Sequence, residues 1–187
     1  MFSTLKKFLT LSVAMLSASL LVGCAPPPDL ALKGITPVKQ PFDARLVSVE
    51  AEGLAKPDFF LLVGPRAKEM GSLIPEFLKK GLEEANLFDP KGKTPVRIMA
   101  KLKRVDAPKS MNFPTDTSIE YLIIDENTGK EVLRKYIQVT DFAEFTSLVG
   151  LVRAHNSFDK SVRSNMMMFI NTLKFLNQKK QILQKAN

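Results

Sequence analysis

Two stretches decide the fold, "VRIMAKLKRV" (residues 96–105) and "TSIEYLIIDENTGKEVLRKYIQVT" (residues 117–140). The first alternates apolar with mostly basic residues, the period of two that is typical of a β-strand with one buried face. The pattern predicts Val96, Ile98, Ala100 and Leu102 on the core face, with Arg97, Met99, Lys101 and Lys103 on the opposite face.

The second stretch predicts a β-hairpin that turns at residues 126–129. The sequence Glu-Asn-Thr-Gly suits a type I turn closed by a left-handed glycine. The resulting register places six residues on the core face: Ile119, Tyr121, Ile123, Leu133, Ile137 and Val139. Lys135 falls on the same face, which we expect only at a sheet edge, where its side chain can reach water.

The flanking segments complete an α+β pattern. We expect strands at "ARLVSVEA" (44–51) and at "PDFFLLVG" (57–64), a continuous apolar run between proline and glycine. A helix is expected from near Ser72, with Pro75 in its first turn. A second helix, capped by Asn156 or Ser157, carries an apolar stripe of Phe158, Val162, Met166, Phe169, Leu173 and Leu176. The order predicts a mostly antiparallel sheet of about five strands packed by two main helices.

The N-terminal residues 1–23 have the pattern of a secretory signal peptide. Lys6 and Lys7 precede an uncharged, largely apolar run that ends at the small residue Gly23. The run is shorter than the ~20 apolar residues of a membrane-spanning helix. Residues 24–41 hold five of the twelve prolines, Pro26, Pro27, Pro28, Pro37 and Pro41, and predict an extended tether. Residues 42–187 then form a single domain.

The sequence Leu21-Val22-Gly23-Cys24 resembles the lipobox of bacterial lipoprotein precursors. In that class a peptidase cuts between the residues at Gly23 and Cys24, and the cysteine receives a diacylglycerol and an amide-linked acyl chain such as palmitate. The resemblance implies a firm membrane anchor at Cys24, because two or three chains hold a protein where one does not. Ala25 in place of aspartate resembles the type exported to the outer membrane of Gram-negative cells, facing the periplasm. The alternative is an ordinary signal peptide with a chance cysteine.

The residue inventory predicts no catalytic residue, metal or cofactor. Cys24 is the sole cysteine and His155 the sole histidine, so the usual zinc ligand sets cannot be assembled. A serine triad would need His155 as its base, and no glycine-rich phosphate loop is present. Without Lys6 and Lys7, the mature chain has 25 basic and 19 acidic side chains, and its net charge of +6 would suit nucleic acid, but export argues against that partner.

We therefore expect a non-enzymatic binding, assembly or transport-accessory lipoprotein of the cell envelope. The alternative is a hydrolase or transferase that acts on envelope lipid or polymer. The candidate binding surface consists of Arg97, Lys101, Lys103, Arg134 and Tyr136. Two interpretations of this sheet face remain open. In the first, a helix or the segment 142–152 covers its apolar residues. In the second, the face is an exposed apolar patch with a basic rim. Such a patch would suit an acidic partner protein or an anionic lipid.

Overall fold

The computed structural model describes residues 28–53, 60–106, 114–142 and 150–186. The elements follow the order β1 (Ala44–Glu52), α2 (Phe60–Glu84), β2 (Thr94–Asp106), β3 (Pro114–Asp125), β4 (Glu131–Phe142) and α3 (Gly150–Ala186). The strands form one sheet in the order β1-β2-β3-β4, parallel between β1 and β2 and antiparallel elsewhere. The α+β class is confirmed, but the described sheet has four strands and is mixed.

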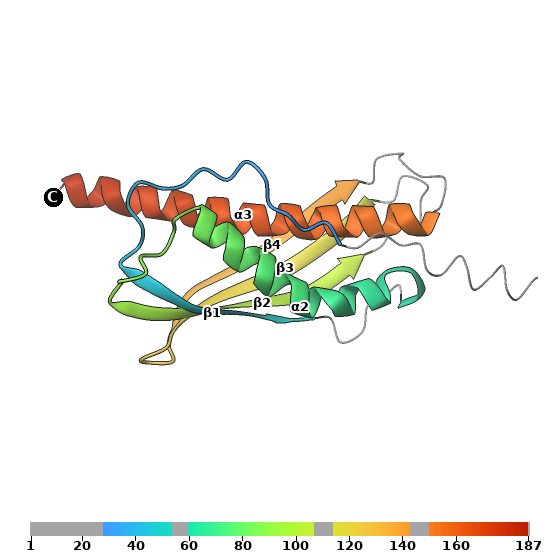
Figure 1. Ribbon diagram of the computed structural model, residues 1–187, viewed down its shortest axis with the longest axis horizontal. Helices are drawn as coiled ribbons and strands as arrows, with labels where there is room; N and C mark the ends of the chain where they lie inside the picture. The colour runs from blue at the N-terminus through green and yellow to red at the C-terminus, as the bar shows by residue number, and fades with distance from the viewer. Residues whose placement is uncertain (1–27, 54–59, 107–113, 143–149, 187) are drawn as a thin grey trace, which may run out of the picture.

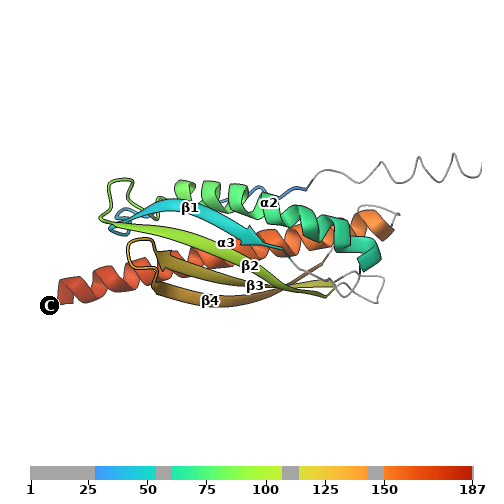
Figure 2. The ribbon, with the colours of Figure 1, turned by 90° about the horizontal axis from the view of Figure 1, so that it is seen from below.

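Both helices pack on the same face of the sheet (Figures 1 and 2). Helix α2 lies over β1, helix α3 lies over β3 and β4, and the two helices contact each other. The core is therefore a single layer between the helices and one sheet face. The opposite face of the sheet, which we call the outer face, is covered by none of the described elements.

The apolar run 57–64 is not a strand where the structure describes it, because α2 begins at Phe60. The expected helix start near Ser72 is wrong for the same reason. A short apolar run does not distinguish a buried strand from a buried helix. Because β1 and β2 pair in parallel, their connection must cross over the sheet, and a helix does this. Pro75 thus lies inside α2, where it has no N–H to donate, and Figure 1 shows the helix changing direction along its length.

The structure confirms both the position of the predicted hairpin turn and the register of its two strands. Gly129 has a φ of 65°, and its N–H donates to the carbonyl oxygen of Asp125 at 2.8 Å. Ile119 pairs with Ile137, and both side chains are buried. Lys135 lies on the core face of β4, which is an edge strand as expected. An inward-pointing charge at an edge discourages a further strand from pairing there.

The predicted apolar stripe of α3 is confirmed, but the predicted N-cap is wrong. Phe158, Val162 and Met166 are fully buried, whereas the helix begins at Gly150, upstream of Asn156 and Ser157. Ser157 lies inside the helix, and its hydroxyl donates to the carbonyl oxygen of Asp141 at 3.1 Å. A residue that resembles a cap in the sequence is used here to bond the helix to the end of β4.

Asn165 fastens α3 to the middle of the sheet. Its side-chain NH₂ donates to the carbonyl oxygens of Thr117 at 3.2 Å and Ile137 at 2.9 Å. The hydroxyl of Tyr121 donates to its side-chain oxygen at 3.0 Å. Burial raises the pKa of Tyr121 well above its usual value, and its ring stacks on Phe169 with centroids 4.0 Å apart. These contacts fix the position of the helix along β3 and β4.

Residues 28–41, which belong to the predicted tether 24–41, lie against the helices of the domain; we call this segment the strap (Figure 1). Leu30 is fully buried in the core. The N–H of Val38 donates to the carbonyl oxygen of Ala85 at 2.9 Å. Further contacts join Arg163 to Asp29, Lys174 to Thr36, and Asn177 to the carbonyl oxygen of Gln40. The strap thus follows α3 over much of its length.

Candidate functional site: the outer face of the sheet

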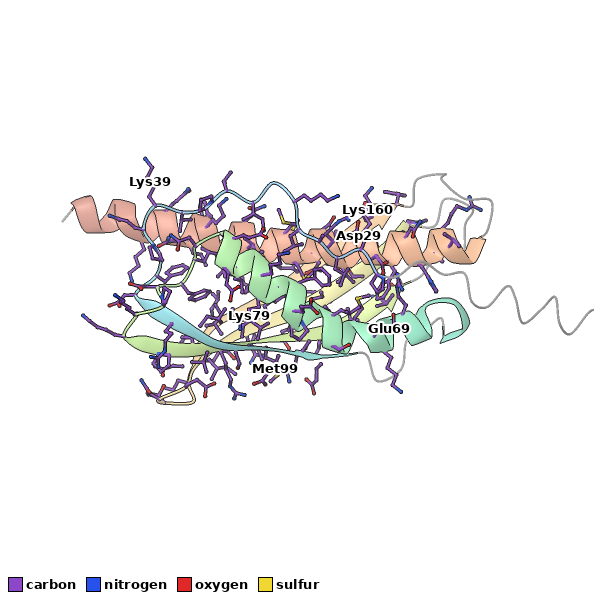
Figure 3. All side chains as sticks on the ribbon, viewed as in Figure 1. Asp29, Lys39, Glu69, Lys79, Met99 and Lys160 are labelled. Atoms are coloured by element: carbon purple, nitrogen blue, oxygen red, sulfur yellow. The ribbon has the colours of Figure 1, made fainter. Side chains whose placement is uncertain are left out.

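The outer face brings together all five residues of the predicted binding surface. Arg97, Lys101 and Lys103 come from β2, and Arg134 and Tyr136 come from β4. They share one face because successive side chains of a strand point to opposite sides of a sheet. Figure 3 shows Met99, from the same side of β2, pointing away from the helices.

Large apolar side chains are exposed on this face. Tyr136 is 57% exposed and Val132 is 61% exposed, both on β4, and Val47 on β1 is 50% exposed. Leu122 on β3 pairs with Arg134 and is only 9% exposed, so the exposed apolar surface is largely confined to the edge strands β4 and β1. Exposed aromatic and aliphatic groups beside charged groups are typical of protein interfaces. The hairpin register predicted Val132 and Tyr136 on this face, whereas sequence reasoning missed Val47.

The four cations of the outer face are held in ion pairs. Lys101 Nζ lies 2.8 Å from Glu52 Oε2, and Lys103 Nζ lies 3.6 Å from Glu120 Oε2. The remaining pairs join Arg97 to Glu50 and Glu126, and Arg134 to Glu120 and Glu131. A hydrogen bond from Lys101, together with its charge, lowers the pKa of Glu52. The expected basic rim is therefore neutralised by carboxylates from β1, β3 and the hairpin.

Most of these ion pairs join neighbouring strands, and they contribute little to folding. Exposed pairs are typically worth about 0–1 kcal/mol each, and salt screens them. Their effect on the surface is larger, because they fix a pattern of alternating sign next to Tyr136 and Val132. A partner must match that pattern to bury the apolar groups, and a mismatched partner would leave charges unpaired.

His155 is the only histidine of the sequence, and therefore the only candidate for the base of a serine triad. It lies inside α3 rather than before it, and it is 9% exposed. Asp159, one helical turn later, is engaged by Arg66 through two contacts of 3.0 and 2.6 Å. His155 lines neither the pocket between the strap and α3 nor the apolar pocket described below. Within the described ranges, no group of three or more histidine, cysteine or acidic side chains could hold a metal ion.

The predicted anchor at Cys24 and the cleavage position after Gly23 lie outside the described residues. Neither of the helices in the described part of the chain combines the length and the apolar character needed to cross a membrane. The lipid anchor therefore stays a prediction from the lipobox resemblance.

No family model matches the chain, and no curated protein matches its sequence. Solved structures do share its fold. A protein of the DUF330 family from Xanthomonas campestris has a TM-score of 0.50 at 9% identity, covering 79% of this chain and 95% of that one.

Two further structures are more distant. A Helicobacter pylori protein described as a homolog of a neuraminyllactose-binding hemagglutinin has a TM-score of 0.49 at 10% identity, covering 84% of this chain and 100% of that one. A lipoprotein from Neisseria meningitidis has a TM-score of 0.31 at 14% identity, covering 75% and 99%. At these identities the likeness is one of fold alone.

Proposed function

We propose that the protein is a lipid-anchored, non-enzymatic binding module of the bacterial cell envelope, and that it docks a partner protein on the outer face of the sheet. The observation that carries this proposal is the exposure of Val132 and Tyr136 on a sheet face that the helices leave uncovered. A sheet face that contacts only water normally carries polar residues at such positions.

The charges on this face favour a protein partner over an anionic lipid surface. The cations are Arg97, Lys101, Lys103 and Arg134, and the carboxylates paired with them are Glu50, Glu52, Glu120, Glu126 and Glu131. An anionic membrane is attracted by unbalanced basic residues. A folded protein can instead present its own alternating charges around an apolar centre.

The lipobox resemblance supports an anchor at Cys24, in the outer membrane and facing the periplasm. The strap then keeps the domain close to that membrane. Four residue steps separate Cys24 from Pro28, the first described residue, and a fully extended chain covers at most about 14 Å over that distance. The partner would therefore be met near the membrane surface.

The test is site-specific photo-crosslinking in intact cells, with the crosslinking amino acid at Tyr136 or, as a matched control, at Lys79. Lys79 is 53% exposed on α2, on the helical side of the molecule (Figure 3). We expect a discrete crosslinked protein at Tyr136 and none at Lys79. Equal crosslinking at both positions, or none at either, would contradict the proposal.

Charge reversal provides a second test of the same surface. Lys101→Glu combined with Lys103→Glu should abolish the Tyr136 crosslink, because both new carboxylates face Glu52 and Glu120 and break the pattern of sign. The melting temperature should fall only modestly, because the two lost ion pairs lie near the surface, where each is worth about 0–1 kcal/mol, and like charges on neighbouring strands cost a similar amount. A folded double variant that crosslinks as the wild type does would show that these charges take no part in docking.

A further inference from the structure

The core face of the sheet is incompletely covered beneath the C-terminal part of α3. A pocket of about 330 Å³ opens there. Figure 1 shows that α3 runs on past the end of the sheet. Apolar side chains line it from three directions: Phe42 and Phe88 at one side, Ile123 and Leu133 from the strands, and Leu173 and Leu176 from the helix. The rings of Phe42 and Phe88 contact each other with centroids 5.9 Å apart, so this wall is well packed.

Two charged residues, Asp43 and Lys180, also line the pocket. Asp43 already has a partner, because its Oδ1 accepts a hydrogen bond from the Lys93 N–H at 3.1 Å and its Oδ2 lies 3.8 Å from the Lys93 ammonium. Lys180 has no ion-pair partner among the residues that the structure describes. The charge left available at this apolar pocket is therefore a single positive one.

We propose that the pocket binds the acyl chain of an anionic amphiphile, with the carboxylate or phosphate of the ligand paired to Lys180. Ligand sites are mostly apolar with a few polar groups that fix orientation, and they range over about 300–1,000 Å³. The pocket is at the lower end of this range, so it takes a segment of one chain rather than a whole lipid. An apolar wall with one free ammonium matches that chemistry better than it matches a polar metabolite.

The ligand that fits this pocket is a separate molecule rather than the lipid predicted at Cys24. A thioether-linked diacylglycerol and an amide-linked acyl chain carry no anionic group, so neither could pair with the ammonium of Lys180 at the pocket.

The pocket also meets the outer face. Val132 lines the pocket and is at the same time one of the exposed residues of the outer face. A protein docked on that face would therefore contact the rim of the pocket. This arrangement suits a module that receives or presents an amphiphile while bound to its partner.

The test uses tryptophan fluorescence, because the natural chain contains no tryptophan. Phe42→Trp places the reporter in the pocket wall, and Phe175→Trp, at a residue that is 65% exposed on α3, is the matched control. The purified protein in a non-ionic detergent is titrated with dibromostearate, whose bromine atoms quench tryptophan on contact. We expect strong saturable quenching of Phe42→Trp and little quenching of Phe175→Trp. Equal quenching of the two reporters would overturn the proposal.

The contact between the ligand head group and Lys180 is tested in two ways, by changing the charge of the residue and by changing the charge of the ligand. Lys180→Glu in the Phe42→Trp background should weaken dibromostearate binding about tenfold, as the loss of one charge-assisted contact predicts. Lys79→Glu should leave it unchanged. The uncharged methyl ester should bind the Phe42→Trp protein about tenfold more weakly than the free acid does, because it cannot pair with Lys180. Equal binding of ester and acid would refute the role of Lys180.

Repeating the titration with dibrominated phosphatidylglycerol distinguishes a free fatty acid from a membrane phospholipid as the natural ligand. Binding of the acid alone identifies a free fatty acid, and tighter binding of the phospholipid identifies a membrane lipid. If Phe42→Trp lowers the melting temperature, Phe88→Trp reports from the opposing ring of the same wall. Failure of these titrations would leave the Tyr136 crosslinking result unaffected, so the two proposals can be judged separately.

Discussion

Replacing Asn165 by leucine should destabilise the protein, because this side chain ties α3 to two strands at once. The substitution keeps a similar volume but removes three buried hydrogen bonds, to Tyr121 and to the carbonyl oxygens of Thr117 and Ile137. Each such bond is worth about 1 kcal/mol net, and partners left unsatisfied in the core cost more. We expect a loss of about 3 kcal/mol in the free energy of unfolding.

Urea denaturation followed by circular dichroism measures this loss. For a domain of this size, about 3 kcal/mol corresponds to a fall of about 6–12 °C in melting temperature. The slope of the transition should not change, since the same surface is exposed on unfolding. Tyr121→Phe should cost about 1 kcal/mol alone and much less in the Asn165→Leu background, because its hydroxyl has then already lost its partner. A neutral or stabilising Asn165→Leu would refute the argument that these bonds hold α3 in place.

The remaining predictions concern the anchor and the pH response. The intact mass of the protein purified from membranes should show loss of residues 1–23 and gain of acyl chains at Cys24; a mass that retains Lys6 would contradict this. Burial acts to raise the pKa of Asp141, but hydrogen bonds from Ser164, Lys160 and the Phe142 amide prevail and hold it below 3.8. Its contribution to stability is therefore present above that value and is lost as the pH falls through the lowered pKa. Asp141→Asn should lack this loss, and its urea midpoint should vary less than that of the wild type between about pH 5 and about pH 2.

The parts of the fold that were predictable have a local cause. In β2 the alternation of Val96, Arg97 and Ile98 assigns each side chain to a face without reference to the rest of the chain. In the hairpin, Gly129 closes a short turn, and the turn then sets every pairing in β3 and β4. The stripe of α3 repeats at helical spacing and could be followed to Leu176.

The parts that were not predictable depend on distant partners. The run that opens α2 has no alternation, so only the parallel pairing of β1 with β2 reveals that a helix must connect them. The prolines of the strap indicate extended chain, but they do not show that Leu30 packs in the core.

The candidate site shows the same division. Alternation places Arg97, Lys101 and Lys103 on one face, as the sequence predicts. Their neutralisation requires Glu50 and Glu52, which reach them only because β1 is the neighbour of β2 in the sheet. The pocket beside Lys180 depends on how far α3 extends past the sheet, and no local pattern encodes that.

If Cys24 is the membrane anchor that we propose, the strap has a mechanical consequence. A slack linker would absorb tension between membrane and domain, whereas the strap passes tension directly into α3 through Arg163 and into the core through Leu30. Because its contacts follow one another along the helix, from Asp29 to Gln40, a pull on the anchor would load them one at a time, beginning at the membrane end. A firmly engaged partner that moves relative to the membrane could therefore peel the strap from the domain before the sheet itself yields.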